Sequence, residues 1–379
     1  MKIGITCYPT YGGSGAVATE LGIGLAARGH EVHFISYAQP FRLSGFHERV
    51  YFHEVEMERY PLLEHPHYTL ALAAAIHDTA LRESLDLIHV HYAIPHATSA
   101  WVAREMLEEN GGLPLVTTLH GTDVTLVGLY SSLHPITRFS IMRSQGVTAV
   151  SEYLKEVTVR DFGVPAESIR VIPNFVDTGV FRRDRTPCHR EALAPGGERI
   201  VMHVSNFRPV KRVADVIEVF AGIRRSVPAR LVMAGDGPDR PRAAELAGLL
   251  GVADDVVFLG KHAAVEELLS CADLFLLTSE SESFGLAALE AMACGVPVVG
   301  YRAGGLPEVV SHGEVGVLVP IGATGEATAA ATELLADADL WERRSEAARA
   351  VAVESFAVER VLPHYEAYYM EVLSEGSAG

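Results

Sequence analysis

The chain has 379 residues, of which 49% are apolar and 21% charged, and its formal net charge is −17. This composition excludes a disordered or collagen-like chain, and the length predicts two domains. The acidic balance disfavours general binding of nucleic acid, which needs a surface rich in Lys and Arg. The four cysteines have no CxxC spacing, which disfavours zinc fingers and a disulfide framework. The chain has no signal-peptide pattern and no apolar run long enough to span a bilayer, so we expect a soluble, cytoplasmic protein.

Short β-branched runs alternate with segments of helical period through the first half of the chain. The predicted strands are 3–8, 31–37, 87–91, 115–119, 147–151 and 169–172. A helix is predicted from Ala16 to Ala27, with Gly29 at its C-terminal cap. Successive strand–helix units of this kind predict a parallel, doubly wound sheet.

A polar stretch rich in Pro and Gly, residues 178–199, interrupts this pattern and predicts a domain boundary. A second alternating series follows, with predicted strands at 200–205, 229–234, 256–259, 274–278 and 296–301. We therefore expect an α/β protein of two Rossmann-like parallel-sheet domains facing a central cleft. The predicted domains are 1–175, joined by a C-terminal helix at about 358–379, and 176–357.

A first glycine cluster, Gly13-Ser14-Gly15, follows a predicted strand and precedes a predicted helix. Backbone N–H groups and the helix dipole favour an anion at such a place. The cluster also matches GxGxxA, the pattern of NAD-binding domains, but the second strand lacks the acidic residue that would hold the ribose. The pattern therefore favours a phosphate or sugar contact over a dinucleotide, with a plain tight turn as the alternative.

The most informative stretch is residues 279–297, where an acidic turn leads from a strand into a helix beginning near Gly285. The N–H groups of Gly285 and Leu286 are expected to face an anion. Glu282 and Glu290 are eight residues apart, which is about two helical turns, so Glu290 can share a face with the turn. Carboxylates beside an anion site suit a nucleotide sugar, whose hydroxyls donate to them. A solvated acidic helix start is the alternative.

The Glu-x7-Glu pattern within ESFGL-x2-LEAMACGVPV is similar to the hallmark of retaining GT-B glycosyltransferases of family 4. The segments 173–177, 235–238 and 304–309 resemble further landmarks of that family in the same order, and the resemblance covers nearly the whole chain. Segments 2–9, 12–15, 40–43, 91–93, 117–123 and 203–208 more closely resemble the bacillithiol-pathway family that joins N-acetylglucosamine to L-malate. This resemblance implies UDP-N-acetylglucosamine as donor, L-malate as acceptor and retention of the α configuration.

The resemblance also implies roles for residues of the second half. Glu290 matches the acid that holds the ribose, and Glu282 matches the acid that meets the donor sugar. Lys211 matches the lysine on the donor phosphates. Many relatives carry an arginine where this chain has Asn206, and Arg208 lies near enough in sequence to supply the charge. Gly13 and Gly15 of the first half complete the expected donor contacts, together with the Gly285 and Leu286 amides.

His120 matches the family's histidine beside the reacting sugar, where we expect it to position the sugar. Enzymes of this class are thought to react on one face, and the leaving phosphate oxygen takes the acceptor proton. The expected catalytic residues are therefore His120, Lys211 and Glu282, with no separate general base.

Malate carries two carboxylates and needs cations or many donors. Arg138 lies in an otherwise apolar helix, where we expect it on the buried side with an anionic partner, either malate or a protein carboxylate. We expect Ser14, Tyr92, Thr118 and Asn174 to lie on loops facing the cleft and to donate to malate. Ordinary structural hydrogen bonding is the alternative for these four.

The spacing of His89-Val90-His91 is typical of metal ligands, but no third ligand accompanies it. Asp337-Ala338-Asp339 matches DxD but lies in an alanine-rich helical stretch and not after a strand, so no metal and no cofactor is expected. A related transferase with another acceptor, such as an inositol phosphate, a lipid or a polysaccharide, remains open. So do a UDP-sugar epimerase and a catalytically silent binding module. The expected partners are small-molecule substrates without nucleic acid or stable membrane association, and a homo-oligomer is left open.

Overall fold

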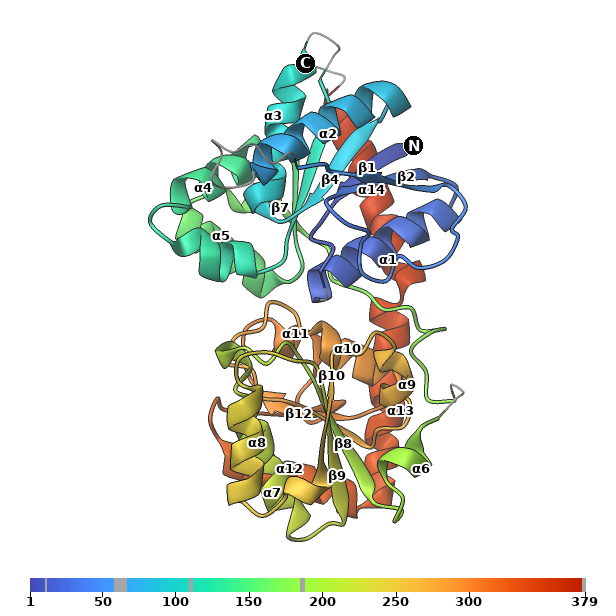
Figure 1. Ribbon diagram of the computed structural model, residues 1–379, viewed down its shortest axis with the longest axis vertical. Helices are drawn as coiled ribbons and strands as arrows, with labels where there is room; N and C mark the ends of the chain where they lie inside the picture. Colours follow the sequence, from blue (N-terminus) through green and yellow to red (C-terminus); the bar gives the residue numbers. More distant parts are fainter. Residues whose placement is uncertain (11, 58–66, 109–111, 185–187, 377–379) are drawn as a thin grey trace. The chain divides into compact units, whose positions relative to one another are not determined.

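The computed structural model describes residues 1–10, 12–57, 67–108, 112–184 and 188–376. The chain divides into two compact units (Figure 1). One unit comprises Met1–Pro173 and the segment from Val361 onward, and the other comprises Asn174–Arg360. Residues 185–187 of the predicted boundary stretch lie outside the described residues.

The first unit is built on a sheet of seven strands. These are β1 (Lys2–Thr6), β2 (Glu31–Ser36), β3 (Val50–Glu54), β4 (Leu87–His91), β5 (Leu115–Leu119), β6 (Gly146–Ala149) and β7 (Ile169–Val171). Their order is β3-β2-β1-β4-β5-β6-β7, and every neighbouring pair is parallel. Strands β4 and β5 are buried along their whole length, as expected where helices cover both faces of a sheet.

The helices of the first unit are α1 (Gly13–Ala27), α2 (Tyr68–Glu83), α3 (Thr98–Met106), α4 (His134–Arg143) and α5 (Glu152–Phe162). The predicted start of the first helix at Ala16 is wrong. The helix begins at Gly13 because the amide of Ala16 already donates to the Gly12 carbonyl at 3.1 Å. The glycine cluster is therefore the first turn of α1 itself.

The second unit repeats the plan with six parallel strands in the order β10-β9-β8-β11-β12-β13. The strands are β8 (Arg199–Val204), β9 (Ala229–Ala234), β10 (Val256–Gly260), β11 (Leu274–Leu277), β12 (Val298–Tyr301) and β13 (Gly316–Val319). The helices are α6 (Arg190–Leu193), α7 (Val213–Arg224), α8 (Arg240–Leu249), α9 (Val265–Leu269), α10 (Leu286–Ala293), α11 (Leu306–Val309), α12 (Thr324–Ala336) and α13 (Ala338–Phe356). Apolar residues of α7, α8 and α12 share one buried core with the sheet. Two parallel α/β units confirm the predicted fold class.

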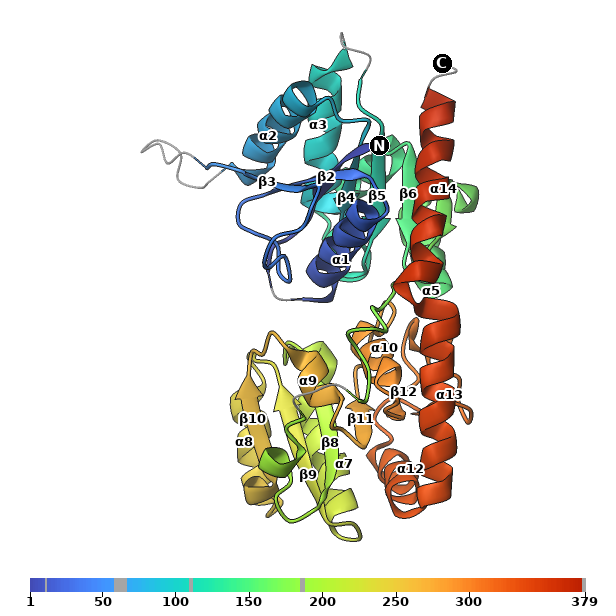
Figure 2. The ribbon, with the colours of Figure 1, turned by 90° about the vertical axis from the view of Figure 1, so that its right-hand side faces the viewer.

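Helix α14 (Val358–Gly376) returns the chain to the first unit, where it lies along the same face as α1 (Figure 2). The guanidinium of Arg28 donates to both oxygens of Glu366, at 2.9 and 2.8 Å. A Cβ added at Gly24 of α1 would lie 2.6 Å from the end of the Leu362 side chain, so the two helices pack closely at this point. Tyr365 and Tyr369 of α14 are fully buried. Each buried aromatic contributes roughly 2 kcal/mol, more than an exposed ion pair, so packing holds α14 in place.

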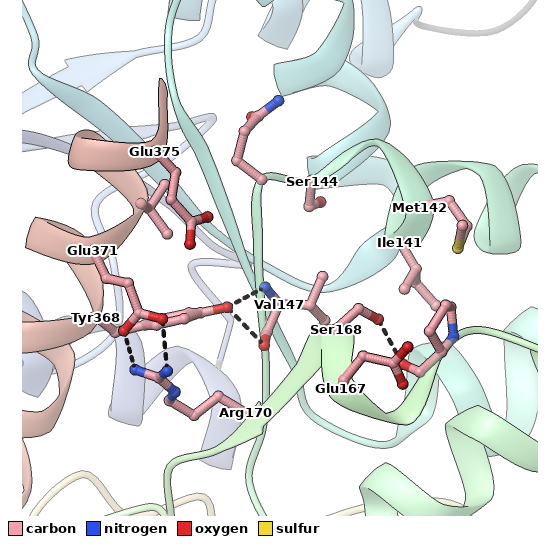
Figure 3. Close-up of a pocket in the computed structure, with 13 residues that line it drawn as sticks. Ile141, Met142, Ser144, Val147, Glu167, Ser168, Arg170, Tyr368, Glu371 and Glu375 are labelled. Carbon is pink, nitrogen blue, oxygen red and sulfur yellow. Dashed lines mark hydrogen bonds and ion pairs between the residues drawn. The ribbon is translucent and has the colours of Figure 1, made fainter. Parts of the chain in front are cut away.

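A cavity of about 250 Å³ lies where α14 meets β6 and β7 (Figure 3). The Tyr368 hydroxyl accepts from the Val147 amide at 2.9 Å and donates to the Val147 carbonyl at 3.2 Å. Arg170 of β7 donates two hydrogen bonds to Glu371, at 2.7 and 2.8 Å, and its guanidinium lies 4.5 Å above the Tyr368 ring. These polar groups bond to one another and attach α14 to β6 and β7, so we assign the cavity a structural role. Among the described residues, no helix combines the length and apolar character needed to cross a membrane.

Candidate functional site

Each sheet contains one point where the strand order reverses, and ligands of doubly wound sheets bind at the carboxyl ends of the strands there. In the second unit the reversal lies between β8 and β11, and in the first unit it lies between β1 and β4. The loops that follow these four strands carry most of the predicted site residues. Sequence order alone does not show this, because β1 and β4 are separated by two other strands along the chain.

The loop after β8 carries Asn206, Arg208 and Lys211, and the segment after β11 holds it in place. The Thr278 hydroxyl donates to the carbonyl of Lys211 at 3.1 Å, and the amide of Glu280 donates to the Val210 carbonyl at 2.9 Å. Arg208 is exposed, whereas Asn206 and Lys211 are half-buried. The two loops thus form one rigid edge at the reversal point of the second sheet.

Lys211 and Glu282 form an ion pair across this edge, with Nζ and Oε1 2.6 Å apart. Their side chains are only 20% and 11% exposed, so water screens the pair poorly. Sequence analysis assigned the two residues to different parts of the donor, and the structure joins them directly. An arriving phosphate would compete with the carboxylate for the ammonium group, and Glu282 would then be free to accept from a hydroxyl.

A glycine turn after β9 packs against the same loop. A Cβ at Gly237 would lie 2.0 Å from the Asn206 carbonyl oxygen, and a Cβ at Gly235 would lie 1.7 Å from the Ser205 carbonyl oxygen. Gly235 also has a φ of +129°, which side chains disfavour. The sequence Gly235-Asp236-Gly237 is therefore required for backbone to approach backbone at this edge.

Two buried side-chain oxygens at this edge, Asn206 Oδ1 and Ser279 Oγ, have no hydrogen-bond partner within the part of the chain that the structure describes. Leaving a buried polar atom unpaired costs about 1–3 kcal/mol. These two oxygens are therefore available to accept hydrogen bonds from a ligand or from water at this edge. Sequence analysis did not assign Ser279 a role, although it lies within the stretch singled out there.

Helix α10 begins beside the ion pair. Gly285 caps it with a φ of +100°, and a Cβ there would lie 2.6 Å from Leu306, so the turn requires glycine. Leu286 opens the helix, and its N-terminus favours an anion. Glu290 is 5% exposed, and its burial within α10 places a carboxylate in the interior close to this turn. The predicted donor residues of the second unit therefore gather around one strand edge.

At the reversal point of the first sheet, the Tyr92 hydroxyl donates to the Ser14 hydroxyl at 2.8 Å, which joins the loop after β4 to α1. Gly13 is exposed, and a Cβ at Gly15 would lie 2.8 Å from the Tyr8 carbonyl oxygen. Burial raises the pKa of Tyr92 to about 12, so its hydroxyl stays protonated and able to donate. Two residues predicted to bind malate are thus hydrogen-bonded neighbours.

Behind this edge lies a layer of buried histidines: His89 and His91 from β4, His96 from the turn after β4, and His120 from the turn after β5. His89 contacts Thr118 Oγ1 through Nε2 and the Tyr369 hydroxyl through Nδ1, both at 2.7 Å. His91 Nδ1 and His120 Nε2 are 2.7 Å apart. Burial lowers the pKa of His89 and His120 to about 3 and that of His91 well below its usual range. These rings are therefore neutral near pH 7.

The buried carboxylate of Asp123 ties the two turns together. Its Oδ2 accepts from the Ala93 amide at 2.9 Å, and its Oδ1 accepts from the amides of Gly121 and His120 at 3.0 and 3.3 Å. Burial is the main cause that raises the pKa of Asp123, to about 6, and these hydrogen bonds oppose the rise. Asp123 therefore holds the turn that carries His120 against the turn that carries Tyr92.

Two expectations about the acceptor residues are wrong in structural terms. Thr118 does not lie on a loop: it is fully buried within β5, and its hydroxyl also contacts Thr148 Oγ1 at 2.7 Å. Arg138 does not lie on the buried side of α4: it is exposed, and its Nε donates to the Phe162 carbonyl at 2.8 Å. Asn174 is 6% exposed, and its Oδ1 has no hydrogen-bond partner among the described residues.

Within the described ranges, no three or more His, Cys, Asp or Glu side chains are grouped so that they could hold a metal ion. Asp337 instead caps α13, where its Oδ1 accepts from the Leu340 amide at 2.9 Å. His91 and Asp123 lie in segments that resemble the family, but no sequence pattern assigned His91 as a partner of His120 or Asp123 as an anchor of the two turns. The alternation of His89 with His91 and of Thr118 with His120 was the available signal, because it places all four on one face of two strands.

Comparison with known proteins identifies the family. Residues 11–180 match the family described as Glycosyltransferase Family 4, and residues 184–351 match Glycosyl transferases group 1. The chain is 47% identical over 380 residues to the N-acetyl-alpha-D-glucosaminyl L-malate synthase of Bacillus anthracis, a match that covers 100% of this chain and 99% of that protein. It is 34% identical to a D-inositol 3-phosphate glycosyltransferase of Thermobispora bispora, over 67% of this chain and 63% of that protein.

Among solved structures, sucrose-phosphate synthase from Thermosynechococcus elongatus has the same fold, with a TM-score of 0.80, 21% identity and 99% of each chain covered. The sequence and structural matches extend over both units. This chain therefore belongs to the GT-B glycosyltransferases of family 4 and group 1, as a full-length relative of the Bacillus anthracis synthase.

Proposed function

We propose that this chain transfers N-acetylglucosamine from UDP-N-acetylglucosamine to the hydroxyl of L-malate, with retention of the α configuration, and releases UDP. The observation that carries the proposal is the 47% identity to the Bacillus anthracis synthase over the full length of both chains. The match covers 100% of this chain and 99% of that protein, so it extends over both units of the fold.

The second unit would hold the donor. Lys211, with Arg208 from the same loop, would neutralise the diphosphate, and Glu282 would accept from a sugar hydroxyl once the phosphate draws Lys211 away. The unpaired oxygens of Asn206 and Ser279 supply further polar contacts. Glu290 would accept from the ribose.

The reaction would break the bond between the anomeric carbon and the β-phosphate oxygen. A new bond from that carbon to the malate hydroxyl oxygen forms on the same face, and the hydroxyl proton passes to the departing phosphate oxygen. Lys211 and the amides of Gly285 and Leu286 would stabilise the charge that develops there. His120 would position the sugar, and this scheme needs no cofactor besides the nucleotide sugar.

The first unit would hold the acceptor. Arg138 uses only Nε on the Phe162 carbonyl, and the described part of the chain supplies no partner for its two terminal nitrogens. An exposed arginine with a free fork suits a carboxylate of malate. The linked hydroxyls of Ser14 and Tyr92 provide additional donors in this unit.

The deciding experiment measures UDP release from UDP-N-acetylglucosamine in EDTA with no acceptor, with L-malate or with D-inositol 3-phosphate, and records the product mass. Malate-dependent release with a malate–N-acetylglucosamine adduct supports the proposal. Release that depends on the inositol phosphate would replace the acceptor, and epimerisation without UDP release would replace the reaction.

Two variants test the division of roles. Arg138→Ala should raise the KM for malate about tenfold or more. Arg143→Ala, at another exposed position of the same helix, should leave it unchanged. Glu290→Gln should weaken UDP binding without changing the KM for malate. An unchanged malate KM in the Arg138 variant would remove that residue from the acceptor site.

A further inference from the structure

His120 and His91 share one hydrogen bond, and its direction determines what His120 offers to a ligand. The two nitrogens, Nδ1 of His91 and Nε2 of His120, are 2.7 Å apart, and the rings are nearly parallel, with 25° between their planes. Both rings are neutral near pH 7 because burial disfavours their charged forms. Each ring therefore carries one proton, and only one of the two protons lies between them.

The second nitrogen of His91 decides between the two arrangements. His91 is fully buried, and its Nε2 has no hydrogen-bond partner among the residues that the structure describes. If His120 were the donor, the His91 proton would reside on this Nε2 as a buried N–H without an acceptor. Orphaned buried N–H groups are rare in folded proteins, whereas under-used acceptors are more common. The arrangement with the His91 proton on Nδ1 is therefore preferred.

The remaining nitrogen of His120 is the one that can meet a ligand. His120 is 8% exposed, and within the described ranges no side chain or backbone group bonds its Nδ1. When His91 donates to Nε2, a neutral His120 carries its own proton on Nδ1. The exposed side of the ring is then a hydrogen-bond donor, which suits sugar and phosphate oxygens.

We propose that His91 is a positioning residue that keeps the proton of His120 on Nδ1, so that His120 presents a donor to the sugar of the bound nucleotide. His91 itself lies in β4, beyond reach of solvent, and acts only through His120. The role toward the sugar rests on the proposed function, whereas the location of the proton does not. Partners that fix the tautomer of a metal-ligating histidine contribute on the order of 10- to 100-fold, and we expect an effect of similar size for His91.

The test begins with the ligand-free protein labelled with ¹⁵N-histidine. Long-range proton–nitrogen correlation spectra distinguish a protonated ring nitrogen from a bare one, and the His120 signals are assigned by their loss in His120→Asn. The expected result is a protonated Nδ1 and a bare Nε2 for both His91 and His120. A protonated Nε2 on His120 would overturn the proposal.

Three variants then separate positioning from structure. In His91→Phe the His120 proton should redistribute between its nitrogens, and kcat should fall roughly 10- to 100-fold while the malate KM stays within about twofold. His91→Asn keeps an N–H near the position of Nδ1 and should restore most of kcat. His96→Asn replaces another buried histidine, which bonds the His91 carbonyl at 2.5 Å but not His120, and should leave the His120 signals unchanged.

Thermal unfolding shows whether each variant is folded, and His91→Asn carries the test if His91→Phe is not. A shifted tautomer with unchanged kcat would refute the positioning role, as would an equal loss of kcat in His91→Asn and His91→Phe with both folded. If the wild-type protein releases no UDP with any acceptor, the proposed function fails, and the spectra still decide where the proton lies.

Discussion

The two units should differ in their tolerance of acid, because buried histidines with lowered pKa values are concentrated in the first. Four of them belong to the histidine layer of that unit, namely His89, His91, His96 and His120. The second unit has His203, whose pKa burial lowers to about 4. Such a histidine stays neutral in the folded unit but has an ordinary pKa of about 6.5 in the unfolded chain. As the pH falls below that value the unfolded chain binds a proton that the folded unit does not, so the free energy of unfolding decreases.

Lowering the pH from 7 to 5.5 costs about 1.2 kcal/mol of unfolding free energy for each such histidine. The four in the first unit together cost about 5 kcal/mol. Asp123 opposes this loss, since its folded pKa of about 6 lies above the unfolded value, and it returns about 0.8 kcal/mol over the same range. The net loss is about 4 kcal/mol in the first unit and about 1.2 kcal/mol in the second.

The two tryptophans of the chain allow each unit to be followed alone. Trp101 lies in α3 against Phe139, and Trp341 lies in α13, where its Nε1 donates to the Asp273 carbonyl at 2.6 Å. Trp341→Phe leaves a probe of the first unit, and Trp101→Phe leaves a probe of the second. Fluorescence during urea unfolding at pH 7 and 5.5 gives the midpoint for each unit.

With a urea dependence of about 2 kcal/mol per molar, the Trp101 midpoint should fall by about 2 M and the Trp341 midpoint by about 0.6 M. Adding His96→Asn to the variant that retains Trp101 should reduce the fall of its midpoint by about 0.6 M. Equal falls in the two reporters, or an unmoved Trp101 midpoint, would refute the view that the histidine layer is buried and neutral.

Three further variants test other parts of the structure. Gly237→Ala should destabilise the protein by about 1–3 kcal/mol and weaken UDP binding. Gly248→Ala, at an open position on α8, is the control and should be neutral or slightly stabilising in thermal unfolding. Equal melting temperatures of the two variants would contradict the close approach of Gly237 to the Asn206 carbonyl. Asp123→Asn should lower the free energy of unfolding in urea by about 1–3 kcal/mol, because the new side-chain N–H group would face backbone N–H donors. A variant of wild-type stability would show that these contacts are dispensable. Arg349→Met should cost about 3 kcal/mol by calorimetry, since it frees three backbone carbonyls, and a loss below 1 kcal/mol would refute that estimate.

Strands buried on both faces were predicted most accurately. The predicted ranges 87–91, 115–119 and 229–234 agree with β4, β5 and β9, since short runs rich in apolar and β-branched residues and bounded by turns have few alternatives. Strands β3 and β13 were missed. β3 is an edge strand with largely exposed side chains, so it lacks the pattern of a buried strand. β13 is mostly buried, but it is a short strand of four residues at the edge of the second sheet. Their partners across the sheet, β2 and β12, are needed to define them.

Placement of the site residues was less predictable than the elements that carry them. The sequence pointed to Lys211 and Glu282 separately, and only folding shows that they neutralise each other at 2.6 Å. Thr118 was expected on a loop although the predicted strand 115–119 contains it, and the structure buries it within β5. Arg138 was expected to be buried because its helix is apolar on average, whereas the exposed face of a helix is set by what packs against it.

By itself, the sequence determined the alternation of strands and helices, the division into two parallel α/β units, the glycine turns and the family. These features depend on residues close together in the chain, whose pattern of apolar side chains and glycines indicates burial and backbone conformation. Tertiary structure alone decided which strands are neighbours, and so which loops meet at the reversal points. The bonds from Tyr92 to Ser14 and from His91 to His120, and the unpaired oxygens of Asn206 and Ser279, depend on that order. Contacts across a sheet join residues that are far apart in the chain, so no local sequence pattern predicts them.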